Sequence, residues 1–155
     1  MGFTGTAAAS RRPTSLARAS NVALAWRPFL LGPIFKAQGW TSSPFNMYPV
    51  KGRNMVRDME RIAADRGIRF VMPQPFPAHS LLGVRIALLG EAEGWTARFS
   101  KAVFSAAFGT DEDIGKPETL SAILTGLGLD AASIIARTGE EAQKAALRQR
   151  TVDAQ

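Results

Sequence analysis

The sequence has no cysteine, a single histidine at position 79 and no long apolar run. Without cysteine the chain can form no disulfide, no thiolate metal site and no dithiol redox centre. Its longest apolar stretches, VALAW and IALLG, are far shorter than the roughly 20 residues that a bilayer-spanning helix requires. These absences exclude a dithiol oxidoreductase and predict a protein without a membrane partner, for which we expect a cytoplasmic location.

Acidic residues are absent from the first 57 positions. Eight of the 19 lysines and arginines lie there, which gives this part a charge of +8, whereas the remaining 11 face all 13 acidic residues. The basic residues are scattered rather than gathered on one element with aromatics between them, so we expect no nucleic-acid partner. A small anionic ligand fits the same asymmetry.

Residues that commonly hold metals or perform nucleophilic catalysis are sparse. The acidic run at 111–113 lacks the ligand spacing and the glycine of a calcium loop, so we expect no metal. No G-x-S-x-G elbow and no phosphate-binding glycine motif is present. His79 follows the proline-rich segment 73–77 and precedes an apolar run. It is therefore either a structural or capping residue or a group that faces a substrate.

Residues 22–31, VALAWRPFLL, have the pattern of a strand whose second half Pro28 places at an edge or bulge. Residues 68–73, IRFVMP, form a second short strand or an extended link. A strand needs partners for its backbone N–H and C=O groups. The strand at 22–31 therefore either pairs with another chain or belongs to a larger domain.

The rest of the sequence predicts helices. One turn is expected within 34–38, and a longer helix begins after Pro49 and ends at Gly67, which suits a left-handed cap. Pro117 suits a first helical turn, and Asp130 suits a cap. Thr138 and Glu141 have the spacing of a capping box. The expected later helices lie within 78–92, 94–109, 117–128, 131–137 and from 139 to the end of the chain.

The segment 29–52, FLLGPIFKAQGWTSSPFNMYPVKG, combines aromatic side chains with the cations Lys36 and Lys51, and Arg53 follows it directly. An anionic ligand needs a fixed positive charge, and an apolar wall would hold the rest of a small acidic molecule. The alternative is that the aromatic residues only cover one end of the helical core. From the residues alone, both interpretations stay open.

Residues 1–20 are rich in alanine, serine, threonine and arginine and have no clear period. Such a composition resembles a transit peptide, but no export-type apolar region accompanies it. We favour a disordered leader or a mis-assigned start. The expected domain then covers 21–155, with a strand and ligand loop at 22–52 and a helical subdomain at 50–153.

The motifs WRPFLLGPIFKAQGW, SPFNMYPVKGRNMVRDMERIA and DEDIGKPETL, in this order, resemble the family of 2-hydroxychromene-2-carboxylate isomerases and kappa-class glutathione transferases. This family belongs to the DsbA-like branch of the thioredoxin superfamily. The resemblance implies a mostly α chain: the helical subdomain of a DsbA-like thioredoxin fold with one or two residual strands, an incomplete α/β fold truncated at both ends.

The resemblance also implies a glutathione-dependent isomerase of aromatic catabolism, or a related transferase. Glutathione would be the cofactor and a small aromatic carboxylate the substrate. Lys51 matches a family lysine near the carboxylate of glutathione, and the family's loop asparagine falls near Thr41 or Ser42. The candidates for the pocket wall are Trp40, Phe45, Tyr48, Arg53 and His79.

The family's catalytic serine lies in an S-P-x-x turn after the first strand, and residues 1–21 contain no such turn. The G-x-F-G-x-P segment with its cis-proline has no counterpart either. We therefore assign no catalytic residue and expect the isolated chain to be inactive. The alternative is a non-catalytic helical binding module that pairs through an exposed strand edge, for which a homodimer is one expected arrangement.

Overall fold

The computed structural model describes residues 16–17, 19–74 and 76–155. Most of the expected leader, residues 1–15, and Pro75 lie outside the described residues. Within the described ranges the regular structure is helical and no residue belongs to a strand, so the mostly α fold class is confirmed. No helix in these ranges is long and apolar enough to cross a membrane.

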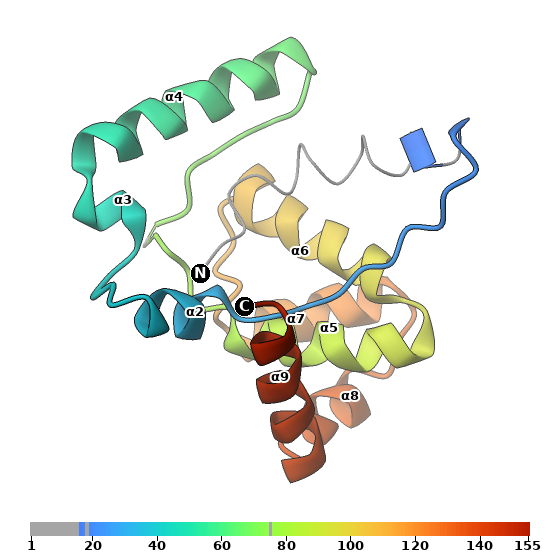
Figure 1. The fold of residues 1–155 in the computed structure, drawn as a ribbon. Helices are drawn as coiled ribbons and strands as arrows, with labels where there is room; N and C mark the ends of the chain where they lie inside the picture. The colour runs from blue at the N-terminus through green and yellow to red at the C-terminus, as the bar shows by residue number, and fades with distance from the viewer. Residues whose placement is uncertain (1–15, 18, 75) are drawn as a thin grey trace.

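The helices are named as in Figure 1. They are α2 (Leu31–Ala37), α3 (Pro44–Met47), α4 (Pro49–Asp65), α5 (Leu81–Glu93), α6 (Thr96–Gly109), α7 (Pro117–Gly126), α8 (Ala131–Arg137) and α9 (Glu141–Asp153).

The predicted strand at 22–31 is wrong. Residues 22–30, the extended segment, run along the helices in an open conformation, and Leu31 already begins α2 (Figure 1). No backbone–backbone hydrogen bond joins residues 23–29 to another described residue. The apolar pattern indicated an extended backbone correctly, but a strand also needs a paired neighbour. Residues 68–73 are likewise an extended link, in which the Val71 N–H donates to the Phe108 carbonyl at 2.7 Å.

The centre of the fold is the hairpin of α5 and α6. Gly94, at φ +80°, ends α5, and the chain turns directly into α6. The indole of Trp95 lies flat against the backbone of α5, so close that a Cβ on Gly90 would sit 2.5 Å from its Cε3 atom. The Thr96 hydroxyl donates to the carbonyl of Ala87 at 2.6 Å and fastens the start of α6 to α5. The glycine thus allows the close approach on which the hairpin depends.

The hydrophobic core forms around this hairpin. Phe99 is 1% exposed, and its ring meets the ring of Trp95 edge-on at 5.9 Å. α7 contributes Leu120 and Leu124, both fully buried, and α8 contributes Ile134. Burial of a side chain of this size stabilises a fold by about 1.5–3 kcal/mol, so this cluster is the main source of stability.

Two ion pairs fasten α8 and α9 to the end of α5. Arg137 lies 2.8 Å from Glu93, and Arg150 lies 2.9 Å from Glu91. The indole N–H of Trp95 also donates to Glu93 at 2.8 Å. This hydrogen bond, followed by that from Arg137, lowers the pKa of Glu93 below its ordinary value.

The extended segment is held at its C-terminal end. The side chain of Leu30 packs against Val84, Leu88 and Leu147, which join α5 to α9. Its N–H donates to the hydroxyl of Thr151 at 3.2 Å. The segment is therefore fixed across α5 and α9 by apolar packing and by one hydrogen bond to a side chain.

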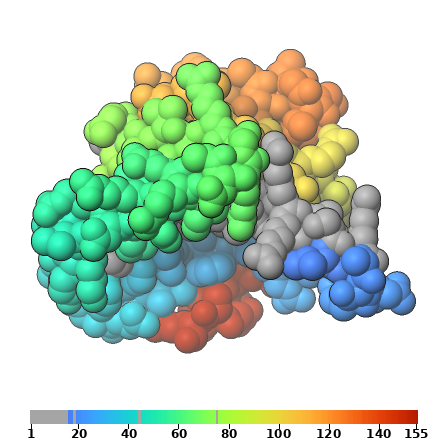
Figure 2. Space-filling model, turned by 90° about the horizontal axis from the view of Figure 1, so that it is seen from above, coloured from blue at the N-terminus to red at the C-terminus, as the bar shows by residue number. Residues whose placement is uncertain are grey.

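α3 and α4 stand to one side of the other helices (Figures 1 and 2). A Cβ on Gly52 would lie 3.0 Å from the carbonyl oxygen of Phe45, so a glycine allows α4 to pack closely on α3. Two ring contacts join α3 and the extended link after α4 to the core. Phe45 of α3 meets Phe76 edge-on at 5.0 Å, and Phe70 of the link stacks on Phe108 at 6.1 Å.

Several helix boundaries agree with the sequence prediction. Pro49 and Pro117 begin their helices, and Gly67 follows α4 at φ +60°. The Asp130 carboxylate caps α8 by accepting from the Ser133 N–H at 3.1 Å. These signals act through local backbone geometry, so they hold without knowledge of the tertiary fold.

The predicted capping box of α9 is wrong. Glu140 occupies the cap position and makes no side-chain cap bond. The Thr138 hydroxyl instead donates to the carbonyl of Ile135 at 2.6 Å, within the end of α8. The hydroxyl that the sequence pattern assigned to the start of α9 therefore binds the end of α8 instead. Glu141 does pair with Lys144, at 2.8 Å.

Two glycines of α5 give opposite predictions for the same substitution. Gly90→Ala should lower the free energy of unfolding by about 1–3 kcal/mol, because the new methyl group overlaps the Trp95 ring. Gly83→Ala is the control: its Cβ would lie 3.8 Å from Leu120, an ordinary contact. It should raise stability by up to about 1 kcal/mol through helix propensity. Urea denaturation of both variants measures this, and a stabilised Gly90→Ala would contradict the packing described.

Candidate functional site

Three of the eight candidate residues come together beside α2. Trp40 stacks on Phe35, with 5.3 Å between ring centres, and meets the Tyr48 ring edge-on at 6.3 Å. The ammonium of Lys51 lies 5.4 Å from the centre of the Tyr48 ring. We call Phe35, Trp40, Tyr48 and Lys51 the aromatic–lysine cluster. It pairs an exposed cation with an apolar wall.

Local backbone geometry explains how the cluster forms. Gly39, at φ +81°, turns the chain after α2, and the Trp40 N–H donates to the Phe35 carbonyl at 2.9 Å. This turn brings the Trp40 ring back over Phe35. Pro49 then starts α4, which places Lys51 in the first turn of that helix.

The first turn of α4 is favourable for an anion. It contains no acidic residue, and no side chain caps it. The unpaired N–H groups of a helix N-terminus carry partial positive charge, which adds to the charge of Lys51. Since Pro49 has no N–H, the amides of Val50 and Lys51 are the donors that remain before the first helical hydrogen bond, in which Gly52 donates to Tyr48 at 2.8 Å.

Thr41 and Ser42 connect the two sides of the cluster. Thr41 is exposed, and the Ser42 hydroxyl accepts from the side-chain amide of Asn46 at 3.0 Å. The next residue, Ser43, is buried and accepts from the Phe45 N–H at 3.3 Å, which caps the start of α3. Sequence reasoning missed Asn46. Its signal was the spacing of four residues from Ser42, which is one helical turn.

The structure places the other three candidates apart. Phe45 turns toward Phe76 and joins α3 to the core. Arg53 is exposed on α4 and has no salt bridge with another described residue. His79 is exposed and lies beside Gly115, near the end of the loop that leads into α7. Among the described residues, no ring contact or cation–ring contact joins any of these three to the aromatic–lysine cluster.

No group of three or more metal-ligating side chains lies together in the part of the chain that the structure describes.

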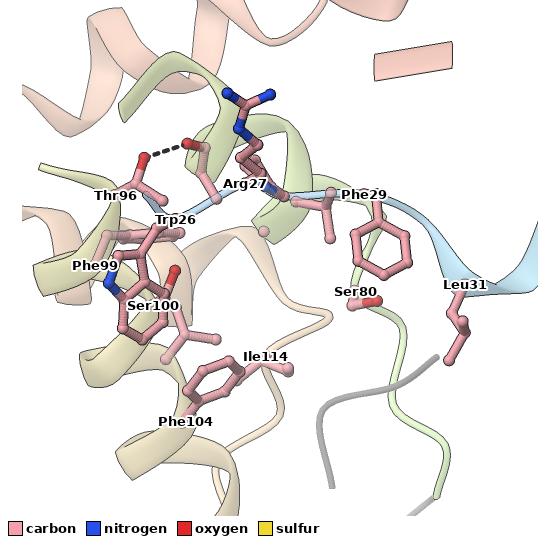
Figure 3. Close-up of a pocket in the computed structure, with 15 residues that line it drawn as sticks. Trp26, Arg27, Phe29, Leu31, Ser80, Thr96, Phe99, Ser100, Phe104 and Ile114 are labelled. Carbon is pink, nitrogen blue, oxygen red and sulfur yellow. Dashed lines mark hydrogen bonds between the residues drawn. The ribbon is translucent and has the colours of Figure 1, made fainter. Parts of the chain in front are cut away.

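A second feature is an apolar cavity of about 180 Å³ between the extended segment and the α5–α6 hairpin (Figure 3). Trp26 and Phe29 form one wall, and side chains of α5, α6 and Ile114 form the rest. Sequence reasoning missed it. The signal was the small residues Gly83 and Ala87, one turn apart on α5 and opposite the aromatic residues of the extended segment.

Comparison with protein families matches residues 7–155 to the DSBA-like thioredoxin domain. The chain belongs to this family. A search of curated proteins found no match. Among solved structures, a 2-hydroxychromene-2-carboxylate isomerase, determined as the selenomethionine protein, is similar with a TM-score of 0.83 and 22% identity. The similarity covers 97% of this chain and 73% of that chain.

The comparison confirms the DsbA-like fold that the resemblance implied. At 22% identity, the likeness to the isomerase shows a shared fold. In this DSBA-like chain, the aromatic–lysine cluster lies where the extended segment passes through α2 into α4, and the cavity lies beneath the extended segment.

Proposed function

We propose that the aromatic–lysine cluster binds glutathione. The observation that carries the proposal is the Lys51 ammonium, held over the Tyr48 ring at the N-terminus of α4. A carboxylate of the tripeptide would accept from Lys51 and from the amides of the first turn. The rings of Trp40 and Tyr48 would contact its apolar atoms. The family resemblance supports glutathione as the ligand.

We further propose that this chain does not catalyse the isomerisation of a chromene carboxylate by itself. The reaction needs a donor that stabilises the glutathione thiolate, and an S-P-x-x turn supplies it in the family. The single Ser-Pro pair in this sequence is Ser43-Pro44. Ser43 is 4% exposed, so burial keeps its hydroxyl from a bound thiol.

The first test is glutathione binding to the full chain by titration calorimetry. Lys51→Met keeps most of the alkyl stem and removes the charge. It should weaken binding at least about tenfold, because one charge-assisted hydrogen bond contributes about 1.5–3 kcal/mol. The matched control is Lys116→Met, at an exposed position before α7. Equal affinity in the Lys51→Met variant and the unmodified chain would contradict the site.

The second test is turnover of 2-hydroxychromene-2-carboxylate with saturating glutathione. We expect glutathione to bind and the rate of isomerisation to equal the rate without protein, because the one Ser-Pro pair of the chain, Ser43-Pro44, has its serine buried away from a bound thiol. Turnover that depends on the chain would overturn the proposed inactivity and leave the binding proposal intact.

A second candidate function is a binding module that pairs through the extended segment. The observation that favours it is that residues 23–29 make no backbone–backbone hydrogen bond with any other described residue. Exposed Val22 and Leu24 lie along the same stretch. An unpaired extended backbone is a template for a strand of another chain, and a second copy would make a homodimer.

Light scattering tests this alternative. A dimer should have a discrete mass of twice the chain. Leu24→Pro and Ala25→Pro each remove one N–H, and neighbouring residues of an extended chain point these groups to opposite edges. The substitution on the paired edge should therefore dissociate the dimer, while the other should leave the dimer intact. A monomer at all concentrations, or equal effects of the two prolines, would contradict pairing through this edge.

A further inference from the structure

We infer that the cavity between the extended segment and the α5–α6 hairpin is a binding site for one small, neutral aromatic ring. None of the residues of the aromatic–lysine cluster lines this cavity. The inference is therefore independent of the proposed binding of glutathione.

The volume fits one ring. The cavity measures about 180 Å³. Engineered cavities of about 150 Å³ with aliphatic and aromatic walls stay dry and bind benzene. A space of this size is too large to be a packing defect of one methyl group, and it is partly open to solvent, so a ligand can enter it. A ring that fills it makes dispersion contacts with its walls.

The walls select an apolar ligand. Phe99, Val103 and Phe104 of α6 line it and are at most 5% exposed, and Ile114 lies beside them (Figure 3). The extended segment adds the ring of Trp26. The side chains of Phe99, Val103, Phe104 and Ile114 provide no partner for the hydrogen-bonding groups of a polar molecule, which would lose its water contacts against them without compensation.

The few hydroxyls around the cavity are mostly engaged. The Thr96 hydroxyl donates to the carbonyl of Ala87 at 2.6 Å, as the dashed line in Figure 3 shows. Ser80 also has an interaction partner. Ser100, half-buried on α6, is the third residue with a hydroxyl at this surface. Among the side-chain hydroxyls that line the cavity, a ligand would therefore find at most the one of Ser100 uncommitted.

The charge around the cavity favours a neutral ligand. Arg27 is the one charged residue among those that line it. Figure 3 shows the Arg27 guanidinium directed away from Phe99 and Phe104, and the residue is exposed. An anionic ring would have to reach this charge through solvent, where it contributes little. A neutral ring makes the same apolar contacts and has no charge whose hydration is lost on binding.

The test uses toluene and the full 155-residue chain. Saturating toluene should raise the melting temperature, since a ligand that binds only the folded state stabilises it. The indole N–H resonance of Trp26 should shift in the same titration, and intermolecular NOEs should join the toluene methyl group to Phe99. Benzoate should bind at least about tenfold more weakly than toluene, which corresponds to about 1.4 kcal/mol.

Two serines of α6 provide a matched pair of variants. Ser100→Leu fills the cavity and should weaken toluene binding at least about tenfold. Ser105→Leu makes the same change at an exposed position of the same helix that does not line the cavity, and should leave binding unchanged.

Circular dichroism verifies that both serine variants are folded. If Ser100→Leu is unfolded, the NOEs of the unmodified chain decide the question. Absence of a saturable shift up to the solubility of toluene, equal binding by the two variants, or benzoate binding as tight as toluene would each overturn the inference.

Discussion

The contact between Trp95 and the bare backbone at Gly90 is the constraint on which the rest of the structure depends. It sets the distance between α5 and α6 and thereby positions Phe99, around which α7 and α8 pack. The indole N–H donates to Glu93 at 2.8 Å, and Glu93 in turn pairs with Arg137 at 2.8 Å. One aromatic residue thus couples the core to the ion pair at its edge.

The two candidate binding surfaces involve successive parts of one continuous stretch of chain. The extended segment lies over the hairpin and forms one wall of the apolar cavity, and Leu30 fixes its end between α5 and α9. Immediately afterwards α2 begins, and the turn at Gly39 places Trp40 against Phe35. A stretch of the same polarity throughout could not both line an apolar cavity and place a cation beside aromatic rings. The chain instead changes from mostly apolar at residues 22–31 to aromatic and basic at 35–53. Neither part contains an acidic residue, which suits an apolar cavity and an anion site.

The sequence predicted the features that depend on local rules. Pro49, Pro117 and Gly67 define helix ends because they restrict the backbone directly, and Asp130 caps α8 because its acceptor lies next to the N–H groups it serves. Contacts between segments that are distant in the sequence could not be predicted from such local rules. The pattern of 22–31 indicated an extended chain, and the helical remainder indicated that this chain offers it no strand partner, but neither showed that the segment lies over the α5–α6 hairpin. The sequence also could not show that Phe45 turns toward Phe76 instead of Tyr48, or that small residues on α5 leave a cavity. Those facts depend on which helices meet.

The central claim is that this chain folds by itself around the α5–α6 hairpin, with the extended segment unpaired. Native-state hydrogen exchange of the purified chain tests it most directly. The account predicts that amides of α5, α6 and α7 exchange most slowly, through global unfolding alone, while those of residues 23–29 exchange almost as fast as in an unfolded peptide. Rapid exchange throughout α5–α7 would contradict the claim that this hairpin organises a stable fold, and strong protection of residues 23–29 would contradict the unpaired segment.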